Sequence, residues 1–289
     1  PFSCPAPQSN GDTRPGSGRI ETNNGTLRKA PMEIIGITGF AQSGKDTAGL
    51  HLTGQRGFTR YAFADKIREI MHTLDYRLNG SVSVAMFLDS LDGDWDKALK
   101  HRVHGPELER AVTLFNRTVA VDAFGDHWRA LSDIREDLYI LDPFLDGDLT
   151  MFELLELLSW DWDAAKTHRL YGFEVRRLLQ KLGTEVVRES YGANAWVDVV
   201  ARQIAEEKPE RAVITDVRFD NEAEWLHSMG APVVRISRPG VGPVNNHKSD
   251  AGISEHLVSV TVDNDSSLEA LASRIDAVRK TPAVALIAA

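Results

Sequence analysis

The sequence predicts an α/β protein with three layers, in which helices cover both faces of a parallel sheet and a helical insert contains an internal duplication. Short apolar runs alternate with helical patterns near both ends of the chain, as is typical of a parallel sheet. A glycine-rich turn joins the first apolar run to the first helical pattern. The middle of the chain, residues 65–207, has mostly helical patterns and repeats itself.

The individual elements follow from local patterns. Residues 33–38 are a β-rich run that ends at a glycine, which predicts a first strand followed by a helix at about 44–52. Residues 58–63 predict a second strand, with a helix beginning near residue 65. Residues 211–216 form a nearly continuous apolar run, as central parallel strands do. The remaining predictions are a helix at 220–229, strands at 232–237 and 258–262, and a last helix at 266–279.

Composition argues against several classes of protein. The net charge of −9 disfavours binding of nucleic acid through a broad basic face. The single cysteine, Cys4, excludes an intrachain disulfide and a four-cysteine zinc site, and fits a reducing cytoplasm. No apolar run reaches the ~20 residues of a membrane helix. A length of 289 residues suits one large α/β domain or two small ones.

The first 31 residues differ from the rest of the chain. They are rich in Pro, Ser, Gly, Asn and Thr, so they cannot bury enough apolar surface to offset their ordering entropy. They also lack the features of a signal peptide. We predict a disordered extension at residues 1–31 and one folded domain at 32–289. Because Met32 directly precedes the first strand, we expect the folded protein, and the start of translation, there.

The repeat is a tandem duplication. Residues 67–105 align with 134–172 at an offset of 67 without a gap, and 16 of the 39 positions are identical. Roughly two or three identities would arise by chance from average composition. We predict a helical insert at 65–198 with two copies, copy one at 65–131 and copy two at 132–198. Two copies are too few for a solenoid, so we interpret them as a duplicated insert in the α/β domain.

A phosphate-binding loop follows the first predicted strand. Gly39, Gly44 and Lys45 fit the pattern G-x-x-x-x-G-K between an apolar strand and a helix. The backbone N–H groups of such a loop attract phosphate oxygens, and Lys45 would neutralise the β- and γ-phosphates. The pattern predicts a P-loop NTPase fold rather than a chance glycine-rich turn. We expect nucleotide contacts from Gly39, Ala41, Gln42, Ser43, Gly44, Lys45, Asp46 and Thr47.

The loop departs from the usual pattern in one place. The residue after Lys45 should be Ser or Thr to hold Mg²⁺, but it is Asp46, and Thr47 comes one position later. Three alternatives remain for the direct ligand of the metal ion: Thr47, Asp46, or water alone. Asp216, at the end of an apolar run, is a second candidate acid, which would hold Mg²⁺ through water or orient an arginine. The alternative is an acid that caps a neighbouring turn; because Arg218 and Glu222 follow closely, we favour a role in the site.

Copy two carries the densest set of polar residues. On a helix, Arg177, Lys181 and Arg188 lie near one stripe, with Arg176 adjacent. Arginines suit bidentate binding of phosphate and charge stabilisation in phosphoryl transfer, although a solvated charged face is the alternative. The small residues at 183–184 favour approach of a ligand. At the positions of Arg176, Gly183, Thr184 and Arg188, copy one has Glu109, Asn116, Arg117 and Val121, so we expect copy two to be the competent one.

Several motifs in combination resemble phage-type deoxynucleoside monophosphate kinases, which are relatives of the P-loop nucleoside monophosphate kinases. The motifs are EIIGITGFAQSGKDTAG (33–49), YAFADKIRE (61–69), WDAAK (162–166), EVRRLLQKLGTEVVR (174–188), NAW (194–196), TDVRFDNEAEWL (215–226), SE (254–255) and VDND (262–265). In this family the lysine of the loop is followed by a non-hydroxyl residue and then threonine, so Asp46 becomes a marker of the family. The family pattern has one helical unit, and the duplicated insert is a departure from it.

The resemblance implies ATP and Mg²⁺ as co-substrate and cofactor, and a deoxynucleoside monophosphate as the acceptor. The residues that would act in catalysis are Lys45, Arg176, Arg177, Arg188 and Asp216. The residues that would contact the acceptor are Asp65, Lys66, Gly183, Thr184, Arg188, Trp196, Asp216, Arg218 and Glu222.

The resemblance also implies a small-molecule partner rather than nucleic acid or a membrane, a possible homodimer, and a cytoplasmic location, in the host if the gene is phage-borne. Two alternatives stay open. One is another P-loop small-molecule kinase, such as a dephospho-coenzyme A kinase, and the other is a nucleotide-binding module without catalysis. The complete set of arginines, together with the GT and DVR motifs, favours an enzyme.

Overall fold

Five parallel strands form the central sheet of the computed structural model, which describes residues 32–124, 130–242 and 251–280. In spatial order they are β2 (Thr59–Tyr61), β5 (Arg211–Ile214), β1 (Glu33–Thr38), β6 (Val233–Ser237) and β7 (Val260–Asp263). β1 is central and pairs with both β5 and β6. The prediction of a parallel sheet is confirmed, and every predicted strand is present with ends moved by one or two residues. The predicted extension at residues 1–31 lies outside the described residues.

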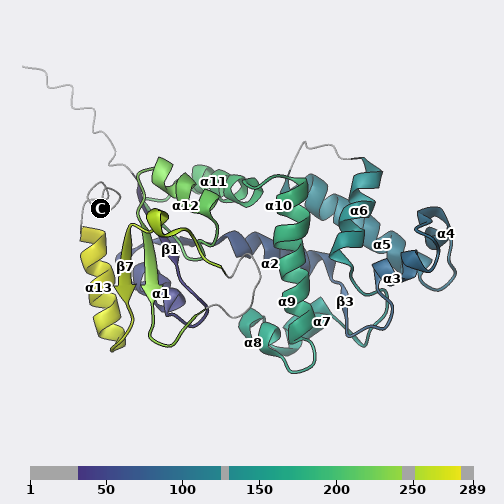
Figure 1. Cartoon of the computed structure of the whole chain (residues 1–289), viewed down its shortest axis with the longest axis horizontal. Coiled ribbons are helices and arrows are strands. Elements are labelled where there is room, and N and C mark those ends of the chain that lie inside the picture. The colour runs from purple at the N-terminus through teal and green to yellow at the C-terminus, as the bar shows by residue number, and fades with distance from the viewer. Residues whose placement is uncertain (1–31, 125–129, 243–250, 281–289) are drawn as a thin grey trace, which may run out of the picture. The chain divides into compact units, whose positions relative to one another are not determined.

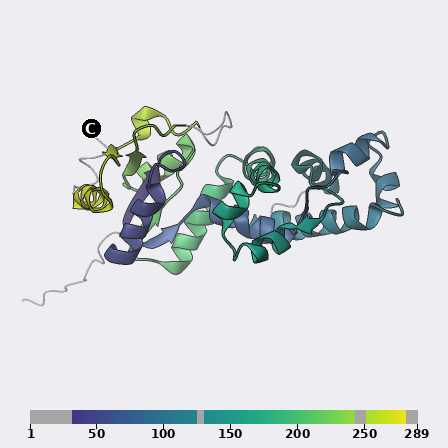
Figure 2. The ribbon, with the colours of Figure 1, turned by 90° about the horizontal axis from the view of Figure 1, so that it is seen from below.

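One face of the sheet is covered by α1 (Lys45–Arg56) and α13 (Leu268–Lys280), the purple and yellow helices that lie side by side in Figure 2. Buried Leu52 of α1 and Ile275 of α13 belong to the same apolar cluster as Ile37 of β1. The C-terminal helix of the chain therefore packs directly beside the helix that follows the glycine-rich loop.

The other face of the sheet is covered by α12 (Asp220–Ser228) and by α2 (Phe63–Leu74), against which α11 (Ala195–Glu207) packs. Ile34 of β1 and Leu226 of α12 share this second apolar cluster. Because successive residues of a strand point to opposite faces, β1 contributes to both clusters. The predicted three-layer α/β class is confirmed.

The chain between β2 and β5 is almost entirely helical. α2 begins at the sheet and runs into this insert (Figure 1). Within the described residues, no helix is both long enough and apolar enough to cross a bilayer. The elements that follow α2 are β3 (Arg77–Leu78), α3 (Val84–Asp89), α4 (Trp95–Leu99), α5 (Gly105–Phe115), the π-helix η1 (Asn116–Ala123), α6 (Leu131–Leu141), β4 (Leu149–Thr150), α7 (Met151–Leu157), α8 (Trp162–Thr167), α9 (Gly172–Gln180), the π-helix η2 (Lys181–Val186) and α10 (Val187–Ser190).

The elements of copy one recur in copy two at the offset of 67 residues. α3 begins after Ser83 and α7 after Thr150, and both hydroxyls accept a hydrogen bond from the first turn of their helix. In the same way Asp94 caps α4 and Asp161 caps α8. A π-helix directly follows α5 in copy one and α9 in copy two. The duplicated sequence therefore forms the same succession of capped helices in each copy.

The two copies exchange hydrogen bonds reciprocally. The backbone N–H of Ala85 in copy one donates to Asp142 Oδ1 of copy two at 2.8 Å, and Phe152 N in copy two donates to Asp75 Oδ1 of copy one at 2.9 Å. Both aspartates have left-handed φ angles, 46° and 51°. The strands β3 and β4 pair antiparallel between the copies. The insert is thus a pseudo-symmetric pair in which each copy caps a helix of the other.

Candidate active site

The glycine-rich loop lies at the end of the central strand, where parallel sheets bind their ligands. Gly39, Gln42 and Gly44 have φ angles of 149°, 65° and 101°. A Cβ atom on Gly44 would lie 2.3 Å from Asn264 Nδ2, and one on Gly39 would lie 2.7 Å from Ile236 O. Both glycines are therefore required by backbone conformation and by close contacts, which agrees with a loop that brings backbone N–H groups to a phosphate.

Two side chains that sequence reasoning missed hold this loop in place. Asn264 Nδ2, just after β7, donates to Ser43 O at 2.8 Å, and Asn264 N donates to Ser237 O at 2.6 Å. Arg238, just after β6, donates to Gln42 O at 3.4 Å. The VDND motif at 262–265 carried a signal for Asn264, whereas Arg238 had none.

The side chains of the loop suit a phosphate ligand. Lys45 Nζ lies 3.1 Å from the carboxylate of Asp46, and the lysine side chain is 12% exposed while the aspartate is 73% exposed. Ser43 Oγ is buried and has no hydrogen-bond partner within the described residues. A buried hydroxyl without a partner costs free energy that a phosphate oxygen would recover.

The predicted metal ligands fit a metal ion that is bound together with the nucleotide, rather than one that the protein holds without it. No group of three His, Cys, Asp or Glu side chains suited to a metal ion is found in the described part of the chain. Mg²⁺ takes most of its ligands from phosphate and water, so one or two protein oxygens suffice. Thr47 and Asp46, on the first turn of α1, offer a hydroxyl and a carboxylate beside the loop.

Asp216 caps the first turn of α2. Its Oδ1 accepts a hydrogen bond from Phe63 N and its Oδ2 from Ala64 N, both at 2.9 Å. This is the alternative considered for a strand-end acid, so the structure shows a positioning contact where the sequence favoured a metal or arginine contact. Because both carboxylate oxygens are used, Asp216 fixes the start of α2 beside the loop.

The predicted acceptor residues of α2 form local ion pairs. Asp65 lies 2.5 Å from Arg60 and 2.9 Å from Arg68, and Lys66 lies 2.6 Å from Glu69. All five side chains are at least partly exposed. The pairs therefore leave these charges accessible from solvent at the end of α2 nearest the sheet.

Arg188 and Glu222 form the most buried charged cluster of the predicted set. Arg188 Nη1 lies 3.5 Å from Glu222 Oε1, and Arg188 Nη2 donates to Asn221 Oδ1 at 2.7 Å. The guanidinium stacks 3.8 Å from the ring centre of Phe219. Glu222 also accepts hydrogen bonds from the backbone N–H groups of Arg218 and Phe219. The structure thus brings Arg188, Arg218 and Glu222 together, as the sequence predicted.

Burial changes the acid–base properties of this cluster. It raises the pKa of Glu222 to about 7, although the backbone donors act in the opposite direction. The nearby charge of Asp216 adds to the rise, and Arg188 opposes it. Burial also lowers the pKa of Arg188, which Glu222 partly offsets. The cluster therefore lacks a fully compensating negative charge, which an anionic ligand would provide.

The two adjacent arginines of α9 have different surroundings. Arg177 donates to Glu174 and to the backbone O of Asp142, both at 2.6 Å, so its guanidinium braces the junction between the copies. Arg110 makes the corresponding bonds in copy one. The same brace therefore exists in both copies, and the catalytic role of Arg177 stays a prediction. Arg176 is exposed and donates through Nε to Lys166 O at 2.8 Å.

Three other predicted acceptor residues lie in the interior. Trp196 is 2% exposed and its Nε1 donates to Gly183 O at 2.8 Å. A Cβ atom on Gly183 would lie 2.8 Å from Ile67 Cδ1. This glycine allows η2 to pack closely on α2. Thr184 is 8% exposed. The structure gives Trp196 and Gly183 packing contacts, and the contacts of all three residues with the acceptor stay predictions.

α8 adds two charged side chains for which the sequence gave no role, although the WDAAK motif contains both. Lys166 Nζ lies 2.5 Å from Asp163 Oδ1. This bond lowers the pKa of Asp163, and the charges of Arg68 and Lys45 lower it further. Burial lowers the pKa of Lys166, as do Arg68 and Arg218, against the effect of Asp163. α8 therefore lies within electrostatic range of the glycine-rich loop, on the side of the insert nearest α1 (Figure 1).

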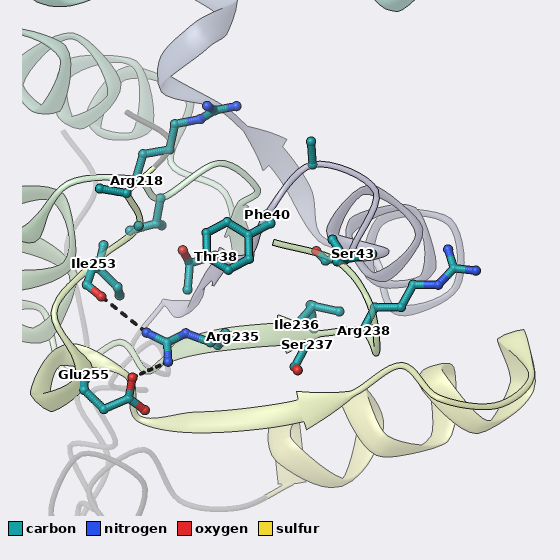
Figure 3. A pocket seen from close by; sticks show the side chains of 16 residues that line it. Thr38, Phe40, Ser43, Arg218, Arg235, Ile236, Ser237, Arg238, Ile253 and Glu255 are labelled. Atoms are coloured by element: carbon teal, nitrogen blue, oxygen red, sulfur yellow. Dashed lines mark hydrogen bonds and ion pairs between the residues drawn. The ribbon is translucent and has the colours of Figure 1, made fainter. Parts of the chain in front are cut away.

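A cavity of about 370 Å³ opens beside the glycine-rich loop (Figure 3). Arg235 points across it, donates to Ile253 O at 3.3 Å and pairs with Glu255. Arg218 and Arg238 border the cavity on opposite sides of Phe40 in Figure 3. Three arginines thus lie around a cavity that adjoins the loop, which suits an anionic ligand.

Comparisons with known proteins agree with this geometry. The sequence profile of the family described as "Deoxynucleotide monophosphate kinase" matches residues 33–275, which include both copies of the insert. The "Deoxynucleotide monophosphate kinase" of Escherichia phage RB69 is 32% identical over 255 residues, covering 85% of this chain and 98% of the relative. The protein of the same name from Enterobacteria phage T4 is 31% identical over 248 residues, 84% of this chain and 97% of the relative.

A further relative extends the same result. The "Deoxynucleoside-5'-monophosphate kinase" of Escherichia phage T5 is 29% identical over 204 residues, which cover 67% of this chain and 71% of the relative. The resemblance indicated by the motifs is therefore confirmed over most of the chain. This chain belongs to the deoxynucleotide monophosphate kinase family.

Proposed function

We propose that the chain transfers the γ-phosphoryl group of ATP to the phosphate of a deoxynucleoside monophosphate and releases ADP and a deoxynucleoside diphosphate. The observation that carries the proposal is a P-loop at the end of the central strand, facing cations from three other elements. Lys45 belongs to the loop itself. Arg68 on α2, Lys166 on α8 and Arg218 after β5 lie within electrostatic range of one another. Such an arrangement suits two nucleotide phosphates that must approach each other.

The reaction needs no covalent intermediate with the enzyme. An oxygen of the acceptor phosphate forms a bond to the γ-phosphorus of ATP, and the bond from that phosphorus to the β–γ bridging oxygen breaks. The electron pair stays with the bridging oxygen, so ADP is the leaving group. Lys45 would balance the charge on the transferred group, and the glycine-rich loop would orient it through backbone N–H groups.

Mg²⁺ is proposed as the metal cofactor, because it supplies charge neutralisation between the β- and γ-phosphates when bound. Thr47 and Asp46 are the protein oxygens beside the loop that would contact it directly or through water. Asp46 also pairs with Lys45, so one carboxylate contributes to both cations of the loop. Asp216 is proposed to position α2, and each of its oxygens keeps a lone pair for the contact with the site that the sequence predicts.

The acceptor is proposed to lie between the loop, α2 and the cluster of Arg188 and Glu222. Arg188 has a guanidinium nitrogen that is buried and without a hydrogen-bond partner within the described residues. Arg218, Asp65 and Lys66 border the same region from the β5–α12 loop and from α2. Arg176 is proposed to contribute from α9. The cationic residues would bind the monophosphate, since arginine and lysine donate charge-assisted hydrogen bonds to phosphate oxygens.

Among the alternatives, neither a dephospho-coenzyme A kinase nor a module without catalysis is favoured by an observation on the described residues or by the relatives. The cytoplasmic location and the homodimer concern properties outside the site, and they stay predictions. The proposed substrate alone assigns the reaction to deoxynucleotide metabolism.

The test is release of ADP with each of the four common deoxynucleoside monophosphates, with AMP and dephospho-coenzyme A as alternative acceptors. We expect turnover with at least one deoxynucleotide and a fall of about 1,000-fold or more in kcat for Lys45→Ala. Lys100→Ala removes an exposed lysine of copy one and serves as the matched control. Tight ATP binding without turnover of any acceptor would instead support the module, and unchanged activity of Lys45→Ala would remove the loop from the mechanism.

A further inference from the structure

We infer that Lys166 on α8 binds the phosphate of the acceptor nucleotide and that Asp163 positions its ammonium group for this contact. The inference rests on the proposed function, because it names a further contact of the same site. It assigns a role in the reaction to α8, an element that lies in the duplicated insert and not in the sheet domain.

The ion pair with Asp163 leaves Lys166 with hydrogen-bond donors to spare. Its Nζ lies 2.5 Å from Asp163 Oδ1, which uses one of the three donors of an ammonium group. The lysine side chain is 27% exposed, whereas that of Asp163 is 82% exposed. Lys166 is therefore partly enclosed while keeping two donors for a ligand.

The backbone of this turn is held as well. Arg176 Nε donates to Lys166 O at 2.8 Å, and a Cβ atom on Gly172 would lie 2.6 Å from the same oxygen. The carbonyl is therefore fixed between α8 and α9. A fixed backbone leaves only the side chain of Lys166 free to reorient, so less conformational entropy is lost when it binds.

The charges around α8 point to an anion. Arg68 and Arg218 both act on Lys166, and Lys45 and Arg68 both act on Asp163. Four cations from the loop, α2, α8 and the β5–α12 loop thus lie within electrostatic range of α8. Three of them pair with carboxylates, Lys166 with Asp163, Arg68 with Asp65 and Lys45 with Asp46, and each of these acids is at least 44% exposed. Converging like charges cost free energy unless an anion lies among them. A phosphate monoester carries up to two negative charges and several acceptor oxygens, which is the chemistry that this set of cations requires.

The duplication provides an internal comparison. Copy one has the same cap at the start of α4 as copy two has at the start of α8, but Leu99 occupies the position of Lys166 and Glu109 that of Arg176. Leu99 O lies 2.5 Å from a Cβ atom on Gly105, as Lys166 O does from one on Gly172, so the fold does not require the lysine. The same local structure therefore forms in copy one without these cationic side chains, so the fold does not need them in copy two.

The test is a set of steady-state measurements on the full chain with the most rapidly phosphorylated deoxynucleotide. For Lys166→Ala we expect the KM for that acceptor to rise about 10- to 100-fold while the KM for ATP changes less than about threefold. Lys166→Arg should restore most of the loss, since arginine keeps the charge. Lys97→Ala is the matched control, because Lys97 pairs at i,i+3 with Asp94 on the corresponding helix of copy one.

A second readout separates a contact with phosphate from a structural role. Calorimetric titration of the deoxynucleotide in the absence of ATP should give a Kd that rises in Lys166→Ala by the same factor as KM, with an unchanged midpoint of thermal unfolding. Equal KM values for Lys166→Ala and Lys97→Ala would overturn the inference and leave the proposed function intact. A parallel loss for both nucleotides with a lowered midpoint would also overturn it. Absence of turnover in the unaltered enzyme would instead count against the proposed function, and the titration would still test Lys166.

Discussion

Copy one and copy two of the insert share a frame and differ in charge at a few positions. Both start their short helices with the same kind of cap, and both brace the next helix with a Glu–Arg pair three residues apart. They differ where copy two has Lys166 and Arg176 and copy one has Leu99 and Glu109. What both copies keep holds the fold, and what only copy two has is where we propose contacts with phosphate.

The same comparison corrects an interpretation based on residue type alone. In the sequence, Arg176 and Arg177 are equal candidates for phosphate binding. The structure separates them, because Arg177 and Arg110 bond to equivalent carbonyl oxygens in the two copies. A residue whose contacts are duplicated in a copy without the other site residues is best explained by its structural role.

The largest effect is expected from the deepest arginine of copy two. Arg188→Ala should lower kcat/KM for the acceptor about 100- to 1,000-fold, because it removes a preorganised positive charge next to the proposed phosphate. Copy one has Val121 at the position of Arg188, so the control is Arg117→Ala, which removes an exposed arginine from η1 of copy one. Its kinetic constants should stay within about twofold of the unaltered enzyme. Initial rates with varied acceptor concentration give both comparisons.

Arg188→Ala also removes the ion-pair partner of the buried Glu222 side chain. The stability of this variant therefore has to be measured separately. Removing one member of a buried pair destabilises a protein by about 3 to 5 kcal/mol. Arg188→Lys keeps the charge and loses only the second donor and the stack on Phe219. A folded Arg188→Lys with full activity would show that bidentate recognition is unnecessary, and equal losses in Arg188→Ala and Arg117→Ala would break the comparison between the copies.

The next effect concerns the pH dependence of stability. Glu222 has a pKa of about 7 in the fold, against about 4.5 for an unperturbed carboxyl, so the folded state binds more protons than the unfolded state in that window. The contribution of the Glu222 carboxyl to the free energy of unfolding is fully present below about pH 4.5 and is lost as the pH rises to about 7. A shift of this size corresponds to about 3 kcal/mol of unfolding free energy.

Glu222→Gln should remove this dependence because a neutral amide does not titrate. Urea unfolding followed from about pH 5 to about pH 8 should show a fall in unfolding free energy for the unaltered enzyme and a flatter profile for the variant. Glu107→Gln, at the brace of copy one, gives the control. If Glu222→Gln retained the full slope, the carboxyl would be ionised throughout, and Arg188 would compensate it more strongly than the burial suggests.

Much of the fold could be predicted from the sequence, for identifiable reasons. The strands of the central sheet are short and almost entirely apolar, and a glycine-rich turn marks the end of the first one, so their order and type follow from local pattern. The duplication is visible because caps and turns such as Asp94 and Asp161 need particular residue types. The reciprocal packing of the copies was not predictable, since identical local frames can stack, separate or exchange contacts.

The site was predicted less completely, because residue type does not show where a side chain points. Trp196 is of a type that stacks on bases, but its indole lies in the core. Asp216 is at the predicted strand end, yet both oxygens cap α2. Asn264 lies far from the glycine-rich loop in sequence, and only the tertiary fold brings it there.

The smallest effect tests the shared brace directly. Arg110→Ala and Arg177→Ala each remove a guanidinium that bonds to a glutamate and to a backbone carbonyl of the junction. Each should lower the unfolding free energy by about 2 kcal/mol, which corresponds to a midpoint lower by roughly 4 to 8 °C in a domain of this size. Both variants should retain kcat/KM within about threefold when assayed well below that midpoint. Thermal unfolding and initial rates measured on the same preparations give the comparison. If Arg177→Ala alone lost activity by about 100-fold at equal stability, its guanidinium would contact the substrate, and the equivalence of the two braces would be wrong.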